Sequence, residues 1–372
     1  MMQEPSQVGP GACPPWPVYG LSAAQKQRHM APALSSLTRH HASHCAPYQR
    51  ILQASGIDPE RDFRLEDLPY LPVRLFKEDD LLSVGREEVF KTLSSSGTTS
   101  SRVSRIFLDR HTAQAQSRAL VAILQSVLGK ARLPMLILDH PGVIRDRSAF
   151  SARGAGILGL STFGRDHTYA LDEDMRLDMA AVDAFCCRHA GQPVLLFGFT
   201  FMVWKYFVQA LKHAGITLDL DQAILLHSGG WKKMQDEAVA PEVFKAALRL
   251  SCGIRRVHNF YGMVEQVGSI FLECEHGHLH APAFADLLVR DPADWSVCSH
   301  GQPGLIQVIS VLPRSYPGHS LLTEDLGVIL GEDDCPCGRQ GKYFHVAGRM
   351  AQAEARGCSD TLPAPAADAR PA

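Results

Sequence analysis

Three short apolar runs constrain the fold of this chain more than any other feature of its sequence. Residues 135–138, 194–197 and 223–226 are uninterrupted apolar stretches flanked by turn residues, as is typical of strands buried on both faces of a parallel sheet. Residues 120–127 precede the first run, residues 204–211 lie between the second and the third, and both stretches carry apolar side chains at helical spacing. Strands and helices in alternation predict a parallel α/β core. The second helical stripe could also line an acyl pocket, but we expect it to pack in the core.

The pattern changes near residue 281. Residues 285–289, 305–309 and 321–325 follow one another with no room for long helices between them, which predicts a smaller β subdomain attached to the α/β part. We therefore expect an irregular N-terminal lead (1–18), an α/β core (19–280), a β-rich subdomain (281–348) and a short C-terminal segment ending in a disordered tail (349–372).

Composition excludes several classes of function. With 372 residues, 45% of them hydrophobic, the chain can bury a large core. Its 37 Lys and Arg against 39 Asp and Glu give a net charge of −2, so no overall field attracts nucleic acid or anionic lipid. We find no apolar run long enough to span a membrane and no signal peptide, and we expect a cytoplasmic protein. Its ten cysteines suggest metal or thiol chemistry rather than disulfides.

A run of hydroxyl residues around one glycine, from Leu93 to Ser101, indicates phosphate binding. Main-chain N–H groups of such a loop close on an anion, and the hydroxyls donate to phosphate oxygens or ligate Mg²⁺. The alternative is a solvated linker. Residues 103–108 alternate apolar and polar side chains like a half-buried strand, which favours the loop. No Gly-Lys-Ser or Gly-Lys-Thr closes it, so it is not the P-loop of common NTPases.

Two further motifs follow predicted strands. The strand at 223–226 runs into residues 227–233, His-Ser-Gly-Gly-Trp-Lys-Lys, at the strand end where open α/β sheets bind ligands. Residues 259–265, Asn-Phe-Tyr-Gly-Met-Val-Glu, offer an aromatic ring for stacking on a purine and a carboxylate for Mg²⁺. Each motif alone is also compatible with an ordinary turn.

In this order the three motifs resemble the adenylate-forming superfamily of acyl-CoA synthetases and phenylacetate-CoA ligases, over about residues 70–358. The resemblance implies ATP and Mg²⁺ as cofactors and assigns a role to each motif position. It implies phosphate contacts from Ser95, Ser96, Gly97, Thr98 and Thr99, an adenine site at Ser228, Gly229, Gly230 and Tyr261, a Mg²⁺ carboxylate at Glu265, a ribose-binding Asp325 and a hinge arginine at Arg349.

The chain departs from the superfamily pattern in two places. Ser100 replaces the usual glycine of the phosphate loop, and no lysine follows it, although Arg102 or Arg105 could substitute. About 23 residues follow Arg349, so the mobile C-terminal domain with its catalytic lysine is expected to be essentially absent. We expect Lys232, or the adjacent lysine, to supply the cation for adenylation.

One branch of the superfamily has a similarly short tail. Residues 197–201, 227–233 and 354–360 are similar to the acyl-protein synthetases of the bacterial luminescence fatty acid reductase. In that family a cysteine accepts the acyl group, which implies Cys358 as the nucleophile and an acyl reductase as the protein partner. A thiolate attacks an acyl adenylate readily, and the thioester keeps the acyl group activated. The alternatives are a ligase that delivers acyl-AMP to coenzyme A or another carrier, and an inactive nucleotide- or zinc-binding scaffold.

The remaining cysteines indicate a metal site. Cys274 is followed by three histidines at alternate positions up to His280, and Cys335 and Cys337 come some 55 residues later. Thiolate and imidazole ligands suit tetrahedral Zn²⁺, although reduced surface thiols beside a polar histidine loop would give the same pattern. Phenylacetate-CoA ligases carry a structural zinc on a similar set, and this resemblance implies Cys274, His280, Cys335 and Cys337 as ligands.

Overall fold

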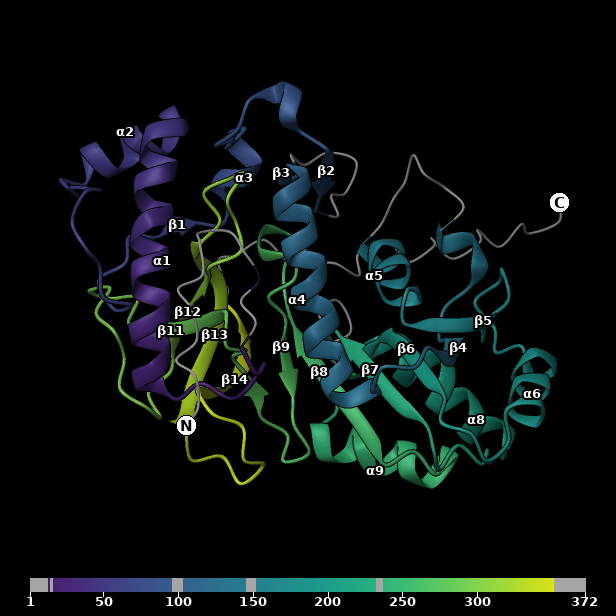
Figure 1. The fold of residues 1–372 in the computed structure, drawn as a ribbon. Coiled ribbons are helices and arrows are strands. Elements are labelled where there is room, and N and C mark those ends of the chain that lie inside the picture. The colour runs from purple at the N-terminus through teal and green to yellow at the C-terminus, as the bar shows by residue number, and fades with distance from the viewer. Residues whose placement is uncertain (1–12, 14–15, 96–102, 145–151, 232–236, 351–372) are drawn as a thin grey trace, which may run out of the picture.

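The computed structural model describes Cys13 and residues 16–95, 103–144, 152–231 and 237–350. Their regular elements follow one another in the order now given (Figure 1). They are α1 (Ala23–His44), α2 (Ala46–Ala54), β1 (Leu71–Pro72), α3 (Leu75–Glu78), η1 (Arg86–Glu88), β2 (Lys91–Ser94), β3 (Arg105–Leu108), α4 (Arg110–Leu128), β4 (Leu133–Ile137), η2 (Pro141–Ile144), α5 (Ala152–Ser161), β5 (Gly164–Tyr169), α6 (Met179–Arg188), β6 (Leu195–Phe199), α7 (Thr200–Met202), η3 (Val203–Val208), α8 (Gln209–Ala214), β7 (Ile224–Ser228), α9 (Pro241–Cys252), β8 (Arg256–Tyr261), η5 (Val264–Gln266), β9 (Phe271–Glu273), β10 (Leu279–His280), β11 (Ala285–Arg290), β12 (Gly304–Ser310), β13 (Ser320–Glu332) and β14 (Lys342–Arg349).

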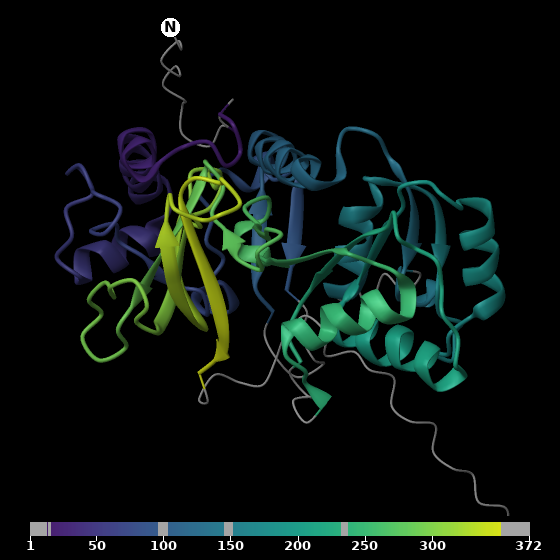
Figure 2. The same ribbon diagram turned by 90° about the horizontal axis from the view of Figure 1, so that it is seen from below.

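One long sheet passes through the whole molecule. Its strand order is β11-β12-β13-β14-β10-β9-β8-β7-β6-β4-β5, with β1 pairing against β13. In this sheet order, the five strands from β8 to β5 are parallel to one another. Each pair of neighbours from β8 and β9 to β12 and β11 is antiparallel. Figure 2 shows the two halves side by side, with the β-rich strands in yellow-green and the α/β half in teal. The α/β fold with a β-rich part is therefore confirmed, whereas the boundary at residues 280 and 281 remains a prediction.

Helices cover both faces of the parallel half, as the apolar runs predicted. On β4, Met135 and Ile137 pack in one core with α4 and α5, while Leu136 packs in a second core with α6, α8 and α9. A strand buried on both faces has no polar side, which explains its uninterrupted apolar sequence. The predicted helices are present as well, with one difference: residues 203–208 form a π-helical segment between α7 and α8. Phe207 of this segment is buried, as expected for core packing.

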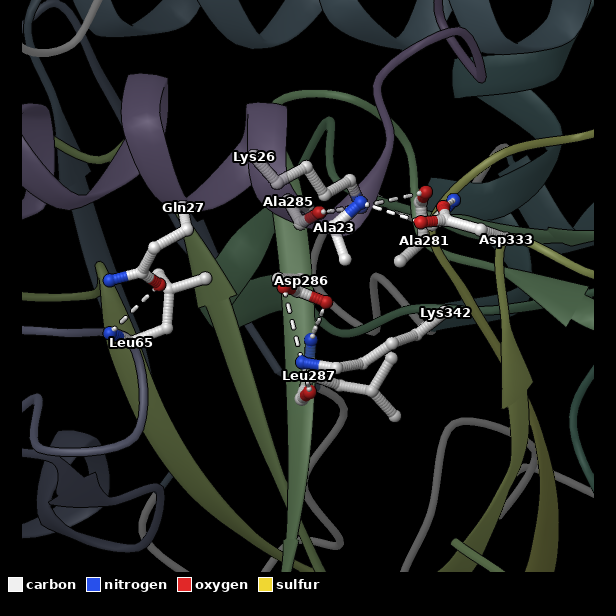
Figure 3. A network of polar contacts seen from close by, with 11 residues as sticks. Ala23, Lys26, Gln27, Leu65, Ala281, Ala285, Asp286, Leu287, Asp333 and Lys342 are labelled. Atoms are coloured by element: carbon white, nitrogen blue, oxygen red, sulfur yellow. Dashed lines mark hydrogen bonds and ion pairs between the residues drawn. The ribbon is translucent and has the colours of Figure 1, made fainter.

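The N-terminal helix α1 lies against the β-rich half and is fixed there by a buried polar network (Figure 3). The ammonium of Lys26 donates to the main-chain oxygens of Ala281 (3.1 Å) and Ala285 (2.9 Å). Beside it, Lys342 of β14 lies 3.3 Å from a carboxylate oxygen of Asp286 on β11. Because all three charged residues are at most 8% exposed, these contacts replace the water that the charges lose on folding.

Candidate functional site

The ends of three parallel strands bring the predicted ligand-binding residues together. Ser228 closes β7, and its hydroxyl donates to the main-chain oxygen of Phe260 on β8 (2.8 Å). Thr200, which follows β6, donates to the main-chain oxygen of Ser228 (3.2 Å) and pairs with Nδ1 of His227 (2.9 Å). Carboxyl ends of neighbouring parallel strands meet at one edge of a sheet, which is where such folds bind ligands.

The backbone after β7 requires glycine. Gly229 has a φ of +82°, in the left-handed region that side chains disfavour. A Cβ at this position would also lie 2.9 Å from Cδ1 of Phe199. Gly230, which follows, has no neighbouring atom within 4 Å of where a Cβ would stand.

A second cluster joins Tyr261, Asp325 and Arg349 beside this edge. The hydroxyl of Tyr261 donates to one carboxylate oxygen of Asp325 (2.7 Å), and Nε of Arg349 donates to the other (3.0 Å). Asp325 and Arg349 are direct cross-strand partners on β13 and β14. Burial and the adjacent carboxylate of Asp325 raise the pKa of Tyr261 well above its usual value, so the phenol remains a donor at neutral pH.

Glu265 lies on the single turn of η5, a few residues beyond Tyr261. Its side chain is 7% exposed, and burial raises the pKa of its carboxyl above the usual value. The positive charges of Lys77 and Arg349 act in the opposite direction. A buried carboxylate with cations nearby is a candidate ligand for a divalent ion.

Lys77 is a residue that the sequence interpretation missed. It lies on α3, which follows β1 and contacts β3. Arg349 is already bonded to Asp325, whereas the ammonium of Lys77 makes no hydrogen bond or ion pair with any residue in the described ranges. No local motif marks this lysine, because it approaches Glu265 only through tertiary structure.

The hydroxyl-rich loop begins where the hairpin of β2 and β3 ends. Ser95 and Ser104 face each other across the hairpin: the N–H of Ser95 donates to the Ser104 carbonyl (3.1 Å), and the N–H of Ser104 donates to Oγ of Ser95 (2.9 Å). Arg105 is engaged in an ion pair with Asp80 (2.6 Å), so it is not a free substitute for the missing lysine. The other predicted loop residues, and two more, lie outside the described residues. They are Ser96, Gly97, Thr98, Thr99, Arg102, Lys232 and Cys358.

The four predicted metal ligands converge at the opposite end of β14. The ligand atoms of Cys274, His280, Cys335 and Cys337 all lie within 4.8 Å of one another. Nε2 of His280 is 3.4 Å from the Cys337 sulfur, and its buried Nδ1 has no hydrogen-bond partner in the described part of the chain. Three thiols and one imidazole at this spacing fit a closed tetrahedral Zn²⁺ site. Burial raises the pKa of all three thiols, which a bound cation would reverse.

Comparison with known proteins identifies the family. The sequence profile described as acyl-protein synthetase, LuxE, matches residues 17–365. The chain belongs to this family. It is therefore an enzyme, a ligase of the acyl-protein synthetase type. A relative from Vibrio harveyi, named long-chain-fatty-acid–luciferin-component ligase, is 23% identical over 310 residues, which cover 79% of this chain and 77% of the relative.

Solved structures support the fold. An open conformation of 2-hydroxyisobutyryl-CoA ligase, in complex with 2-HIB-AMP and CoA, superposes with a TM-score of 0.70 at 16% identity, covering 94% of this chain and 81% of the ligase. The same ligase in its postadenylation state gives a TM-score of 0.67 at 17% identity, with coverage of 89% and 69%. At such identity these matches establish a shared fold. Within the described residues, we find no helix both long and apolar enough to cross a bilayer.

Proposed function

We propose that this enzyme activates a long-chain carboxylic acid with MgATP and then carries the acyl group on its own Cys358. In the first step a carboxylate oxygen attacks the α-phosphorus of ATP, which gives acyl-AMP and releases pyrophosphate. In the second step the Cys358 thiolate attacks the acyl carbon, AMP leaves, and a thioester remains. The thioester then serves an acyl reductase partner. The name of the Vibrio harveyi relative supports the fatty substrate.

The cluster of Tyr261, Asp325 and Arg349 is the observation that carries this proposal. It sets a carboxylate, held by a phenol and a guanidinium, beside the strand ends, where the open space around Gly230 can take a flat ring. A carboxylate in this setting accepts hydrogen bonds from ribose hydroxyls. The proposed nucleotide therefore lies with its adenine at residues 228–230 and its ribose at Asp325.

Mg²⁺ supplies charge neutralisation at the triphosphate in this proposal. Glu265 would hold the ion, and Lys77 would add a positive charge that acts on the same carboxylate. Ser95 and the loop after it donate to the phosphates. Lys232 remains the second candidate for the cation of adenylation, and alanine variants of the two lysines separate them by their effect on pyrophosphate exchange.

The length of the C-terminal segment is compatible with the transfer step. Cys358 follows Arg349 by nine residues, and nine extended residues span at most about 30 Å. Because Arg349 is bonded to the proposed ribose-binding carboxylate, this tether is long enough for the thiol to meet an adenylate bound beside it. Arg356 would favour the thiolate form of the cysteine.

A structural zinc completes the proposal. Cys274, His280, Cys335 and Cys337 would hold Zn²⁺ through all four positions, leaving none open for substrate. The ion would join the segment after β9 to the loop between β13 and β14, and so fix the start of β14. It would stabilise the fold and take no part in acyl transfer.

Labelling distinguishes the proposed reaction from its alternatives. The protein is incubated with radiolabelled myristic acid and MgATP, and protein-bound label is measured after denaturing electrophoresis. We expect protein-bound label that is released by hydroxylamine and is absent in Cys358→Ala. The matched variant Cys187→Ala should keep the label, since Cys187 is exposed and distant in sequence. Label transferred only to added coenzyme A would instead indicate a CoA ligase. ATP binding without acid-dependent pyrophosphate exchange would indicate an inactive scaffold.

A further inference from the structure

The turn that carries Glu265 is held in place by a loop distant in sequence. Tyr316 lies between β12 and β13, and its ring is fully buried. Its hydroxyl donates to the main-chain oxygen of Glu265 (2.9 Å) and accepts from Nε2 of Gln116 on α4 (3.1 Å). Both of these polar groups are hydrogen-bonded to the same hydroxyl, and a buried polar group that loses its hydrogen-bond partner lowers the free energy of unfolding.

The same loop contacts the next residue of the turn. Gln266 donates through Nε2 to the main-chain oxygen of Gly318 (2.8 Å). The loop must turn tightly to reach it: a Cβ on Gly318 would lie 2.2 Å from Cε2 of Tyr316 and 2.9 Å from the main-chain oxygen of Glu265. Residues 316–318 are thus bonded both to Glu265 and to the residue that follows it.

The loop is also bonded to the hairpin that leads into and out of the hydroxyl-rich loop. Ser315 donates through Oγ to the main-chain oxygen of Phe107 on β3 (2.8 Å), and its N–H donates to Oγ1 of Thr112 on α4 (3.2 Å). The Phe76 ring packs edge-on against Tyr316 at 6.0 Å between centroids. The loop at residues 315–318 is therefore bonded both to the Glu265 turn and to the hairpin, and it fixes their relative position.

We propose that Tyr316 is a positioning residue that sets Glu265 relative to the phosphate-binding hairpin. This inference rests on the proposed function, in which the Glu265 carboxylate holds Mg²⁺. Tyr316 touches no substrate atom, because its hydroxyl is used by Gln116 and by the main chain of Glu265. It acts by limiting where the carboxylate points, so its loss weakens the response to Mg²⁺ and leaves the adenine and ribose contacts intact.

Tyr316→Phe tests the inference because it removes only the hydroxyl. The variant loses the bond to the main chain of Glu265 and the bond from Gln116. We expect the Mg²⁺ concentration for half-maximal acid-dependent pyrophosphate exchange to rise about ten-fold, which is about 1.4 kcal/mol. The KM for ATP at saturating Mg²⁺ should stay within two-fold. Tyr48→Phe is the matched control, since Tyr48 is equally buried and its hydroxyl makes no described bond to the Glu265 turn.

A double-variant cycle separates positioning from a general structural role. The Mg²⁺ dependence of ATP binding is measured by calorimetry, which needs no turnover, for Tyr316→Phe in the wild-type and Glu265→Gln backgrounds. We expect the effect of Tyr316→Phe to disappear when the carboxylate is absent. An equal effect in both backgrounds, or a Tyr316→Phe variant that matches Tyr48→Phe, overturns the inference. If the wild-type enzyme itself shows no acid-dependent exchange, the proposed function fails and this inference fails with it.

Discussion

Asp286 offers a quantitative test of the network that holds α1 to the sheet. Asp286 is 1% exposed, and its carboxylate lies 3.3 Å from the ammonium of Lys342. Asp286→Asn keeps the shape of the side chain and removes its charge, so the buried ammonium groups of Lys26 and Lys342 lose the carboxylate that acts most strongly on both. Breaking a buried ion pair from one side costs about 3–5 kcal/mol. We expect about 3 kcal/mol, because the main-chain oxygens that also accept from Lys342 and Lys26 remain.

The pH dependence of this effect has a definite sign. Burial alone would raise the pKa of Asp286, but the ammonium groups of Lys342 and Lys26 lower it below its usual value. A lowered pKa in the folded state means that the carboxylate stabilises the fold above its unfolded-state pKa, and that this stability is lost as the pH falls through the folded-state pKa. The difference between wild type and variant should therefore be full at pH 7 and shrink in acid.

Urea unfolding at pH 7 and at a series of lower pH values measures these differences. The matched control is Asp62→Asn, because Asp62 pairs with Arg39 at 3.4 Å on the surface with its side chain 91% exposed. Exposed pairs contribute less than about 1 kcal/mol. If Asp286→Asn loses no more stability than Asp62→Asn, the buried network does not fix the helix as we argue.

Three further predictions concern the proposed sites. Because burial raises the pKa of Glu265, its charged form destabilises the folded state at pH values above that pKa. Glu265→Gln should therefore unfold at a higher urea concentration than wild type at pH 8, and at the same concentration as wild type below the usual glutamate pKa. The variant should also lose Mg²⁺-dependent pyrophosphate exchange. Elemental analysis should find about one zinc per chain in the wild type and in the exposed-thiol variant Cys187→Ser, and much less in Cys335→Ser; equal contents would contradict the site. Gly318→Ala should lower the free energy of unfolding by about 1–3 kcal/mol through overpacking. The control Gly159→Ala lies on a helix with open space around its Cβ, and it should be neutral or slightly stabilising. Similar urea midpoints for the two variants would refute the packing argument.

The sequence was sufficient to predict the helices and strands whose apolar side chains follow a simple local period. The runs at 135–138, 194–197 and 223–226 correspond to β4, β6 and β7, because a strand covered on both faces must be apolar throughout. The strands at 285–289, 305–309 and 321–325 were likewise identified as β11, β12 and β13. A π-helical segment left no mark on the apolar spacing and was missed.

Local patterns could not reveal contacts that arise from the order of strands in the sheet. Tyr261 is bonded to Asp325 across 64 residues of sequence, although β9, β10 and β14 lie between their strands in the sheet. Lys77 and Tyr316 belong to no motif, since their relation to Glu265 depends on α3 and on the loop before β13. The nucleotide and acyl roles of the motif residues came from the family resemblance, and these roles remain predictions.

The contacts of α1 have a consequence for how the chain is made. Lys26 emerges from the ribosome early, but the carbonyl groups that receive its hydrogen bonds lie 255 and 259 residues later. At roughly 5–20 residues per second, synthesis takes about 10–50 s to reach them. During that interval α1 must remain undocked or be shielded by a chaperone. Helix α1 is thus synthesised well before the strand and the loop that receive its buried ammonium, and it can complete this packing only when they follow.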